Sequence, residues 1–147
     1  MRKKNYNIAI VGLGNIGLSL YKHLTNNRQS IKKKTNVNLT VKYVSAKNKL
    51  KKRKIKIPKK KWLKNYQEAF KRPDIDIVVE LIGGSNGAAK NLVFNSIKNK
   101  KHIVTANKAL ISKHGDSLSK FAEKNKVNLE FEASVAGGVP IIRVIKE

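Results

Sequence analysis

Three glycines near the start of the chain have the spacing of a phosphate-binding turn. They belong to the pattern G-x-G-x-x-G, which here consists of Gly12, Leu13, Gly14, Asn15, Ile16 and Gly17. The first glycine permits a tight turn, the second leaves no side chain where a pyrophosphate approaches the backbone, and the third lets a following helix pack closely. Free N–H groups at the start of that helix would face the phosphates. The pattern directly follows an apolar run and opens a segment of helical periodicity. It therefore predicts a dinucleotide site, with a merely structural glycine turn as the alternative.

The segment Val44-Ser45-Ala46-Lys47-Asn48 bears on which dinucleotide would bind. Folds that bind NAD usually place Asp or Glu at the end of the second strand, where the acid binds the ribose 2′-hydroxyl. No acid is present here, and Lys47 would attract the additional phosphate of NADP. We expect NADP to be preferred and NAD to be tolerated. The alternative is that Lys47 is one solvated lysine among many.

The elements that would position these residues alternate between strand and helix. Short apolar runs predict strands buried in a sheet, and apolar residues at helical spacing predict helices. The expected strands are 8–11, 37–44, a short one at 55–57, 76–82, 102–105 and 127–131, and the expected helices are 16–24, 62–70, 88–97 and 117–122. This order predicts a Rossmann-type α/β fold, with a doubly wound, mostly parallel sheet and helices on both faces.

The composition limits the class of protein. A chain of 147 residues with 40% apolar content can form one domain with a full core. The absence of cysteine excludes a disulfide framework and a thiol nucleophile. The start of the chain has no pattern of an export signal, and no segment approaches the roughly 20 apolar residues of a membrane helix. We expect a soluble, cytoplasmic protein with no membrane partner.

The net charge of +24 has two interpretations, and no Asp or Glu precedes Glu68. One is a protein that binds nucleic acid. The other is compositional drift, since the chain is rich in Lys, Asn and Ile. The basic residues are scattered and few aromatic residues lie among them to stack on bases. Drift is the favoured interpretation, so no specific nucleic-acid partner is expected. Any such binding would be non-specific and steeply dependent on salt.

Four segments in the second half carry a resemblance to a known family. They are Val-Val-Glu-Leu-Ile-Gly-Gly at 78–84, His-Ile-Val-Thr-Ala-Asn-Lys-Ala-Leu at 102–110, His-Gly at 114–115, and Glu-Ala-Ser-Val-Ala-Gly-Gly-Val-Pro-Ile-Ile at 132–142. In this order and spacing they closely resemble the homoserine dehydrogenases, and the resemblance covers essentially the whole chain. It implies an NAD(P)-dependent oxidoreductase that interconverts aspartate semialdehyde and homoserine, in the biosynthesis of threonine, methionine and isoleucine.

The resemblance also implies a division of the chain. Residues 1–132 would form the NAD(P)-binding domain, and 133–147 would begin a substrate and dimerisation domain. The principal proton-donating lysine and the acids that bind substrate would lie further on, in a protein that forms a homodimer or homotetramer. We expect the 147 residues alone to bind cofactor weakly and to have little or no turnover.

Lys108 is the candidate catalytic residue. Hydride transfer to an aldehyde carbon places negative charge on the aldehyde oxygen, which a nearby ammonium group can stabilise. Lys108 follows a predicted buried strand, at the edge where open α/β sheets bind ligands. The resemblance implies that it lies near the nicotinamide and assists the reaction. The alternative is an ordinary surface lysine of the following helix.

The residues around Lys108 have both functional and structural interpretations. Thr105 and Asn107 would contact the cofactor or cap a helix, and Asn is a favourable N-cap in its own right. Gly83 and Gly84 would let the backbone pass close to the nicotinamide ribose, or would form a plain turn. Glu80 is more typical of a paired structural carboxylate than of a catalytic acid. The histidines lack the spacing of metal or triad sites and are interpreted as structural: His23, His102 and His114.

A monovalent cation, most simply sodium, is implied by the resemblance at the last segment. Its ligands would be Glu132 and the backbone carbonyls of Val135, Gly137 and Val139, since a hard cation needs several oxygen ligands. An ordinary interdomain loop is the alternative.

Two further alternatives are another type of dehydrogenase and a protein without catalysis. Acylating aldehyde dehydrogenases need a cysteine nucleophile and are excluded for this chain. A stand-alone dinucleotide-sensing domain without catalysis is disfavoured by the apolar side chains of Ile141, Ile142, Val144 and Ile145, which lack partners in this sequence.

Overall fold

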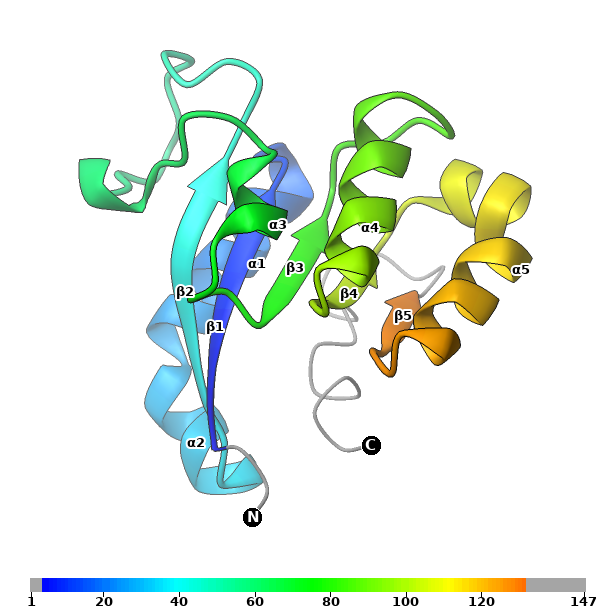
Figure 1. Cartoon of the computed structure of the whole chain (residues 1–147). Helices are drawn as coiled ribbons and strands as arrows, with labels where there is room; N and C mark the ends of the chain where they lie inside the picture. Colours follow the sequence, from blue (N-terminus) through cyan, green and yellow to red (C-terminus); the bar gives the residue numbers. More distant parts are fainter. Residues whose placement is uncertain (1–3, 132–147) are drawn as a thin grey trace.

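The computed structural model describes residues 4–131, which form a five-stranded sheet with helices on both faces (Figure 1). The strand order is β2-β1-β3-β4-β5, and every neighbouring pair is parallel. The strands are β1 (Asn5–Val11), β2 (Asn38–Ser45), β3 (Ile77–Glu80), β4 (His102–Thr105) and β5 (Leu129–Phe131). The predicted doubly wound α/β fold is confirmed.

Two hydrophobic clusters, one on each face of the sheet, form the core. The β1 residues Ile8 and Ile10 pack with Leu20 of helix α1 (Asn15–Asn26) on one face. Ala9 packs with Leu92 of helix α4 (Ala88–Lys98) on the other face. Residues 8–11 of β1 are at most 2% exposed, which explains why this strand is continuously apolar instead of alternating.

The helices are distributed between these two faces, as Figure 1 shows with α1 behind the sheet and α3, α4 and α5 in front. Their bounds are α1 (Asn15–Asn26), α2 (Arg28–Thr35), α3 (Glu68–Lys71), α4 (Ala88–Lys98) and α5 (Lys108–Lys124), with the 3-10 helix η1 (Lys59–Lys61) between β2 and α3. The chain runs from β1 outward to β2, and then crosses back to β3 on the other side of β1. The carboxyl ends of β1 and β3 therefore mark the topological switch point, where open α/β sheets bind ligands.

Between β2 and β3 the structure differs from the sequence prediction. Residues 55–57 form no strand; Ile57 is instead a buried anchor for an irregular loop. The helix expected at 62–70 is reduced to α3, because Trp62 and Leu63 extend along the free edge of β2. The Leu63 N–H donates to the Val44 carbonyl at 2.9 Å, and Trp62 forms a parallel bridge with Val44.

Two other differences concern helices. Asn26 and Asn27 do end α1 as expected, but α2 follows at once, with Asn27 in the position before its first residue. None of the α2 residues is buried, so the sequence has no apolar stripe that would predict this helix. The helix predicted at 117–122 is longer and begins at Lys108, where the Asn107 side chain caps it.

Candidate functional site

The glycine turn lies between the ends of three adjacent strands. The Gly12 N–H donates to the carbonyl of Ser45, the last residue of β2, at 2.9 Å. Gly12 has a φ of +106°, and a Cβ at this position would collide with the carbonyl oxygen of Leu81, directly after β3. Glycine is required here both by the backbone conformation and by the contact with the end of β3.

The other two glycines of the pattern have different surroundings. A Cβ on Gly17 would collide with the Gly12 carbonyl oxygen, so this glycine lets α1 pack tightly against the turn. A Cβ on Gly14 would meet no atom within 4 Å, and Gly14 is exposed. Packing among the described residues therefore explains Gly12 and Gly17 but not Gly14. The space beside Gly14 fits a pyrophosphate that approaches the backbone.

The start of α1 offers hydrogen-bond donors to that space. Gly14 is the N-cap residue, no side chain caps the helix, and the first turn contains no acidic residue. The first bond within this helix runs from the Leu18 N–H to the Gly14 carbonyl at 3.0 Å. The N–H groups of residues 15–17 therefore have no partner inside the helix, and they carry the partial positive charge of its N-terminus. This arrangement suits an anionic group.

A buried carboxylate organises the turn that follows β3. Glu80 is 0% exposed. Its Oε1 accepts hydrogen bonds from the Ile82 N–H at 2.7 Å and the Gly83 N–H at 3.2 Å, and its Oε2 accepts one from the Thr105 hydroxyl at 2.6 Å. Gly83 and Gly84 are exposed and have φ values of +89° and +83°. Glu80 is thus paired, as interpreted from the sequence, and it holds the glycine turn in place.

The turn after β4 is joined to the same network. The Asn107 N–H donates to Thr105 Oγ1 at 3.0 Å, and Asn107 Oδ1 accepts the Leu110 N–H at 3.0 Å. Asn107 Nδ2 donates to the Gly84 carbonyl at 2.7 Å. Asn107 is therefore an N-cap that also ties the two turns together. Contact of Thr105 or Asn107 with a cofactor stays a prediction.

Two lysines flank this edge of the sheet. Lys108 is the first residue of α5, next to Asn107, and Lys47 lies two residues after the end of β2. Both are exposed, and within residues 4–131 neither ammonium group has a hydrogen-bond or ion-pair partner. The carboxyl ends of parallel strands share one edge, so the structure brings both predicted lysines to the edge that holds the glycine turn.

The histidines have structural contacts. His102 Nδ1 accepts the Asn128 N–H at 3.1 Å, and His114 Nε2 lies 3.1 Å from the side-chain amide of Asn86. His23 Nδ1 lies 3.4 Å from the Asn27 side-chain nitrogen. No group of three or more His, Cys, Asp or Glu side chains that could hold a metal ion occurs in the described part of the chain.

Two expectations fall outside the described residues. The candidate cation ligands Glu132, Val135, Gly137 and Val139 lie beyond Phe131, as does the expected domain boundary at 132–133. They stay predictions.

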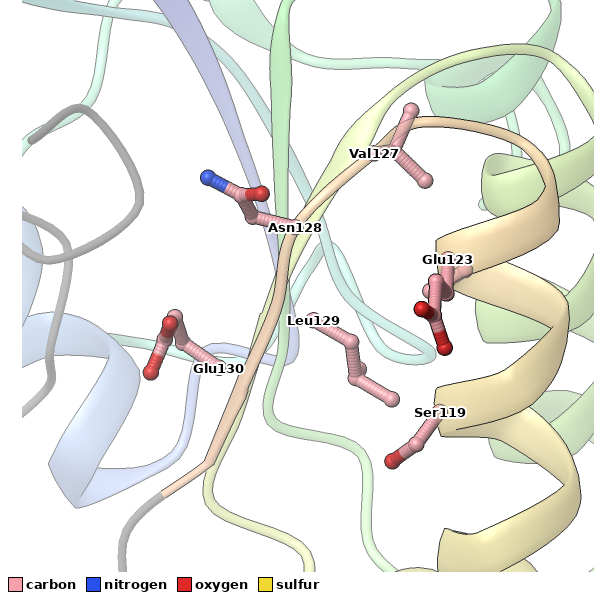
Figure 2. Close-up of a pocket in the computed structure, with 7 residues that line it drawn as sticks. Ser119, Glu123, Val127, Asn128, Leu129 and Glu130 are labelled. Atoms are coloured by element: carbon pink, nitrogen blue, oxygen red, sulfur yellow. The ribbon is translucent and has the colours of Figure 1, made fainter. Parts of the chain in front are cut away.

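A hollow of about 230 Å³ lies between α5 and β5 (Figure 2). Its lining includes Ser119, Glu123, Leu129 and Glu130. None of the residues predicted to bind cofactor lines it. The predicted dinucleotide site is an exposed edge of the sheet, outside this pocket.

Asp74 anchors a polar cluster at the opposite, amino-terminal edge of the sheet. It accepts hydrogen bonds from the Tyr43 hydroxyl at 2.7 Å and pairs with Lys42 at 2.9 Å and Arg72 at 3.4 Å. Partial burial raises the pKa of Asp74, but the hydrogen bonds from Tyr43 and Lys42 and the charges of Lys42 and Arg72 outweigh it. The pKa falls from 3.8 to about 2. Sequence analysis did not identify this cluster, which stabilises the fold and lies outside the candidate site.

None of the helices in residues 4–131 combines the length and apolar character that a membrane crossing needs.

Comparison with known proteins assigns the family. The family described as "Homoserine dehydrogenase, NAD binding domain" matches residues 12–132. The homoserine dehydrogenase of Neisseria gonorrhoeae is 39% identical over 144 residues, which is 98% of this chain and 33% of that protein. The Bacillus subtilis enzyme is 35% identical with the same coverage of both chains.

Solved structures agree with the sequence matches. The S. aureus homoserine dehydrogenase crystal structure at pH 6.0 superposes with a TM-score of 0.81 and 39% identity, covering 94% of this chain and 36% of that one. The chain spans about a third of the length of the curated relatives that it matches. It belongs to the homoserine dehydrogenase family and corresponds to the NAD-binding domain of that family.

Proposed function

We propose that this chain is the cofactor-binding part of an enzyme that interconverts aspartate semialdehyde and homoserine with NADP as the preferred dinucleotide. The observation that carries the proposal is the unequal packing of the glycine turn. Gly12 and Gly17 are required by contacts inside the protein, whereas Gly14 faces open space at the uncapped start of α1. A turn with a purely structural role would give no reason for a bare backbone at Gly14.

The residues of the turn would hold the pyrophosphate. Its oxygens would accept hydrogen bonds from the free N–H groups of residues 15–17, and the N-terminus of α1 would stabilise the negative charge. Leu13 is buried and keeps the turn attached to the core. Gly83 and Gly84, held by Glu80 and Asn107, would border the nicotinamide half of the cofactor.

Preference for NADP rests on the region after β2. The hydrogen bond between the Gly12 N–H and the Ser45 carbonyl fixes the end of β2 beside the glycine turn. Lys47 follows two residues later, is exposed, and has no acidic neighbour in sequence before Glu68. A dianionic 2′-phosphate would gain a charge-assisted hydrogen bond from this ammonium group, while the 2′-hydroxyl of NAD would find no carboxylate. NAD would bind more weakly.

Lys108 is the residue of this chain proposed to assist the reaction. The bound dinucleotide supplies or accepts the hydride. The ammonium group of Lys108 would stabilise the oxygen that becomes negative as the aldehyde is reduced. Because Asn107 caps α5 and is bonded to Gly84, the backbone of Lys108 is held beside the β3 turn and does not depend on a free loop. Preorganised placement of this kind lowers the cost of stabilising the transition state.

The rest of the proposal concerns the whole protein. It includes a homodimer or homotetramer in the cytoplasm, a place in threonine, methionine and isoleucine synthesis, and a sodium ion at residues 132–139. These parts rest on the family resemblance. The remaining two thirds of the relatives' length would supply substrate-binding acids and a second lysine, so little or no turnover is expected from these 147 residues.

The test is a fluorescence titration of the purified chain with NADPH and NADH, using the variant Gly14→Asp and the control Ser19→Asp. Both substitutions add one negative charge to α1 or its cap, but Ser19 is exposed outside the turn. Saturable binding that is tighter for NADPH, abolished in Gly14→Asp and kept in Ser19→Asp, supports the site. Equal binding by both variants would contradict it, and a tenfold preference for NADH would contradict the choice of NADP.

A further inference from the structure

The positive charge of the chain is distributed unevenly along the sequence. Residues 1–67 contain 20 of the 33 Lys and Arg residues and none of the nine Asp and Glu residues. Compositional drift toward lysine would act on the whole chain, and it would not remove every carboxylate from one half alone. Asymmetry of this kind between two halves points to an anionic partner.

The fold gathers this charge along one edge of the sheet. Residues 4–67 form β1, α1, α2, β2, η1 and the loop 46–58, and β2 is the edge strand opposite β5. In Figure 1 these cyan and blue elements lie on one side of the molecule, with the loop and α2 at opposite ends of β2. The exposed lysines of 47–60 and of 32–34 form what we call the basic edge. The eight residues of β2 give it a length of about 25 Å at roughly 3.3 Å per residue.

The loop of the basic edge has a defined shape. The Arg53 guanidinium donates to the carbonyls of Asn48 at 2.7 Å, Lys51 at 3.0 Å and Lys49 at 3.3 Å, and it lies 5.2 Å from the centre of the Trp62 ring. Ile57 anchors the loop in the core. Arg53 is thus occupied within the loop, whereas the lysines around it face solvent. A preformed surface of this kind loses less conformational entropy when a partner binds.

The basic edge is scarcely neutralised within the protein. Within residues 4–67, the ion pair that a basic side chain forms is that of Lys42 with Asp74, and Lys42 lies outside the basic edge. Burial, together with the charges of Lys60 and Arg28, lowers the pKa of Lys61. The Lys61 ammonium lies beside the middle of β2 and donates a hydrogen bond to the Val41 carbonyl at 2.7 Å. The positive charges of Lys60 in η1 and Arg28 in α2 therefore both repel this ammonium group. An anionic partner would relieve this repulsion.

We propose that the basic edge binds the phosphate backbone of a nucleic-acid duplex without reading its sequence. A duplex offers a phosphate on each strand about every 3.4 Å, so an edge of about 25 Å spans several phosphates. Base stacking is not available there: Tyr21 and Tyr43 are buried, and the Trp62 ring is half-buried beside Arg53. A lipid surface fits less well, because Leu50 is the one large apolar side chain exposed in residues 4–67 and gives little area to insert.

The experiment measures fluorescence anisotropy of a labelled duplex of about 20 base pairs as the 147-residue chain is added, over a series of KCl concentrations. The variant is Lys51→Gln/Lys52→Gln/Lys56→Gln on the loop. The matched control is Lys90→Gln/Lys98→Gln/Lys124→Gln on α4 and α5, which removes the same charge from exposed positions. A second variant, Lys32→Gln/Lys33→Gln/Lys34→Gln, tests the far end of the edge. Thermal melting by circular dichroism checks that all variants fold.

The expected result is a steep fall of affinity with salt in the parent chain. Each lost phosphate contact removes about 0.9 from the slope of log K against log salt, so the loop variant should lose roughly 2 to 3 in slope and about tenfold in affinity. The control should keep the parent's slope. Equal losses in the loop variant and the control would show a response to net charge alone and overturn the proposal. So would absence of duplex binding at about 100 mM KCl, equal competition by polyglutamate, or tighter binding to phosphatidylserine vesicles.

Discussion

Thr105→Val should destabilise the domain although it hardly changes the volume of the side chain. The Thr105 hydroxyl is the point where the turns after β3 and β4 meet. It donates to Glu80 Oε2 at 2.6 Å and accepts the Asn107 N–H at 3.0 Å. Thr105 is 1% exposed and Glu80 is 0% exposed, so water cannot replace either bond without opening the site.

The magnitude follows from the two groups that lose a partner. A hydrogen bond to a charged acceptor contributes about 1.5–3 kcal/mol, and a buried N–H left without an acceptor costs about 1–3 kcal/mol. Because the two bonds share one hydroxyl and do not add fully, we expect a loss of about 3 kcal/mol in the free energy of unfolding. For a domain of this size that corresponds to a fall of roughly 6–12 °C in melting temperature.

The assay is thermal and urea unfolding followed by circular dichroism, with Thr105→Ser as the control. Serine keeps the hydroxyl and removes one methyl group, which costs about 1 kcal/mol. NADPH affinity should fall in the valine variant even below its melting range, because Gly84 and the start of α5 lose their connection. Equal melting temperatures for the valine and serine variants would refute the reasoning, since the hydroxyl would then contribute nothing.

Three further predictions concern other parts of the domain. Because the pKa of Asp74 is lowered to about 2 in the folded state, its contribution to the free energy of unfolding is present above pH 3.8 and is lost as the pH falls toward 2. Asp74→Asn should therefore flatten the acid side of a stability-against-pH curve. The control Asp116→Asn, which removes the acid of an exposed ion pair, should not. Gly12→Ala should lower the free energy of unfolding by at least about 2 kcal/mol, because φ is positive there and the new Cβ would collide with the chain after β3. Gly14→Ala should melt like the parent and yet bind NADPH more weakly. Equal losses of stability in a urea titration of the two variants would contradict this distinction. Lys47→Gln should weaken NADPH binding roughly tenfold and leave NADH binding unchanged, and an equal effect on both dinucleotides would remove Lys47 from the phosphate site.

Much of the fold could be predicted from local patterns. Residues 8–11 of β1, 77–79 of β3 and 103–104 of β4 are buried on both faces, so each stretch appears in the sequence as a continuous apolar run. The G-x-G-x-x-G turn was recognisable because it stands between such a run and a segment of helical periodicity. Asn107 was recognisable as a possible N-cap for the same local reason. Burial on the sheet, turn conformation and helix capping all act over a few residues, which is why a sequence alone can express them.

The segment between β2 and β3 was predicted poorly because distant contacts decide its shape. Trp62 and Leu63 follow a helical spacing with later apolar residues, but the free edge of β2 offers Leu63 a backbone hydrogen bond that keeps it extended. Ile57 is held in the core and is not part of a strand. The helix α2, which lies before β2, was missed for a different reason: it has no buried residue, and its last turn consists largely of lysines.

For the candidate site, too, some features follow from the local sequence and others depend on contacts between distant residues. Sequence alone determined that the chain has a G-x-G-x-x-G turn after a buried strand, a Rossmann-type fold and a lysine beyond another buried strand. Only the tertiary structure decided that Gly12 must accommodate the carbonyl of Leu81, that Gly14 faces open space, and that Glu80 and Thr105 share a hydrogen bond. These contacts join the ends of different strands, from residues 25 or more positions apart. They exist because the strand order places β3 between β1 and β4, and no local pattern encodes that order.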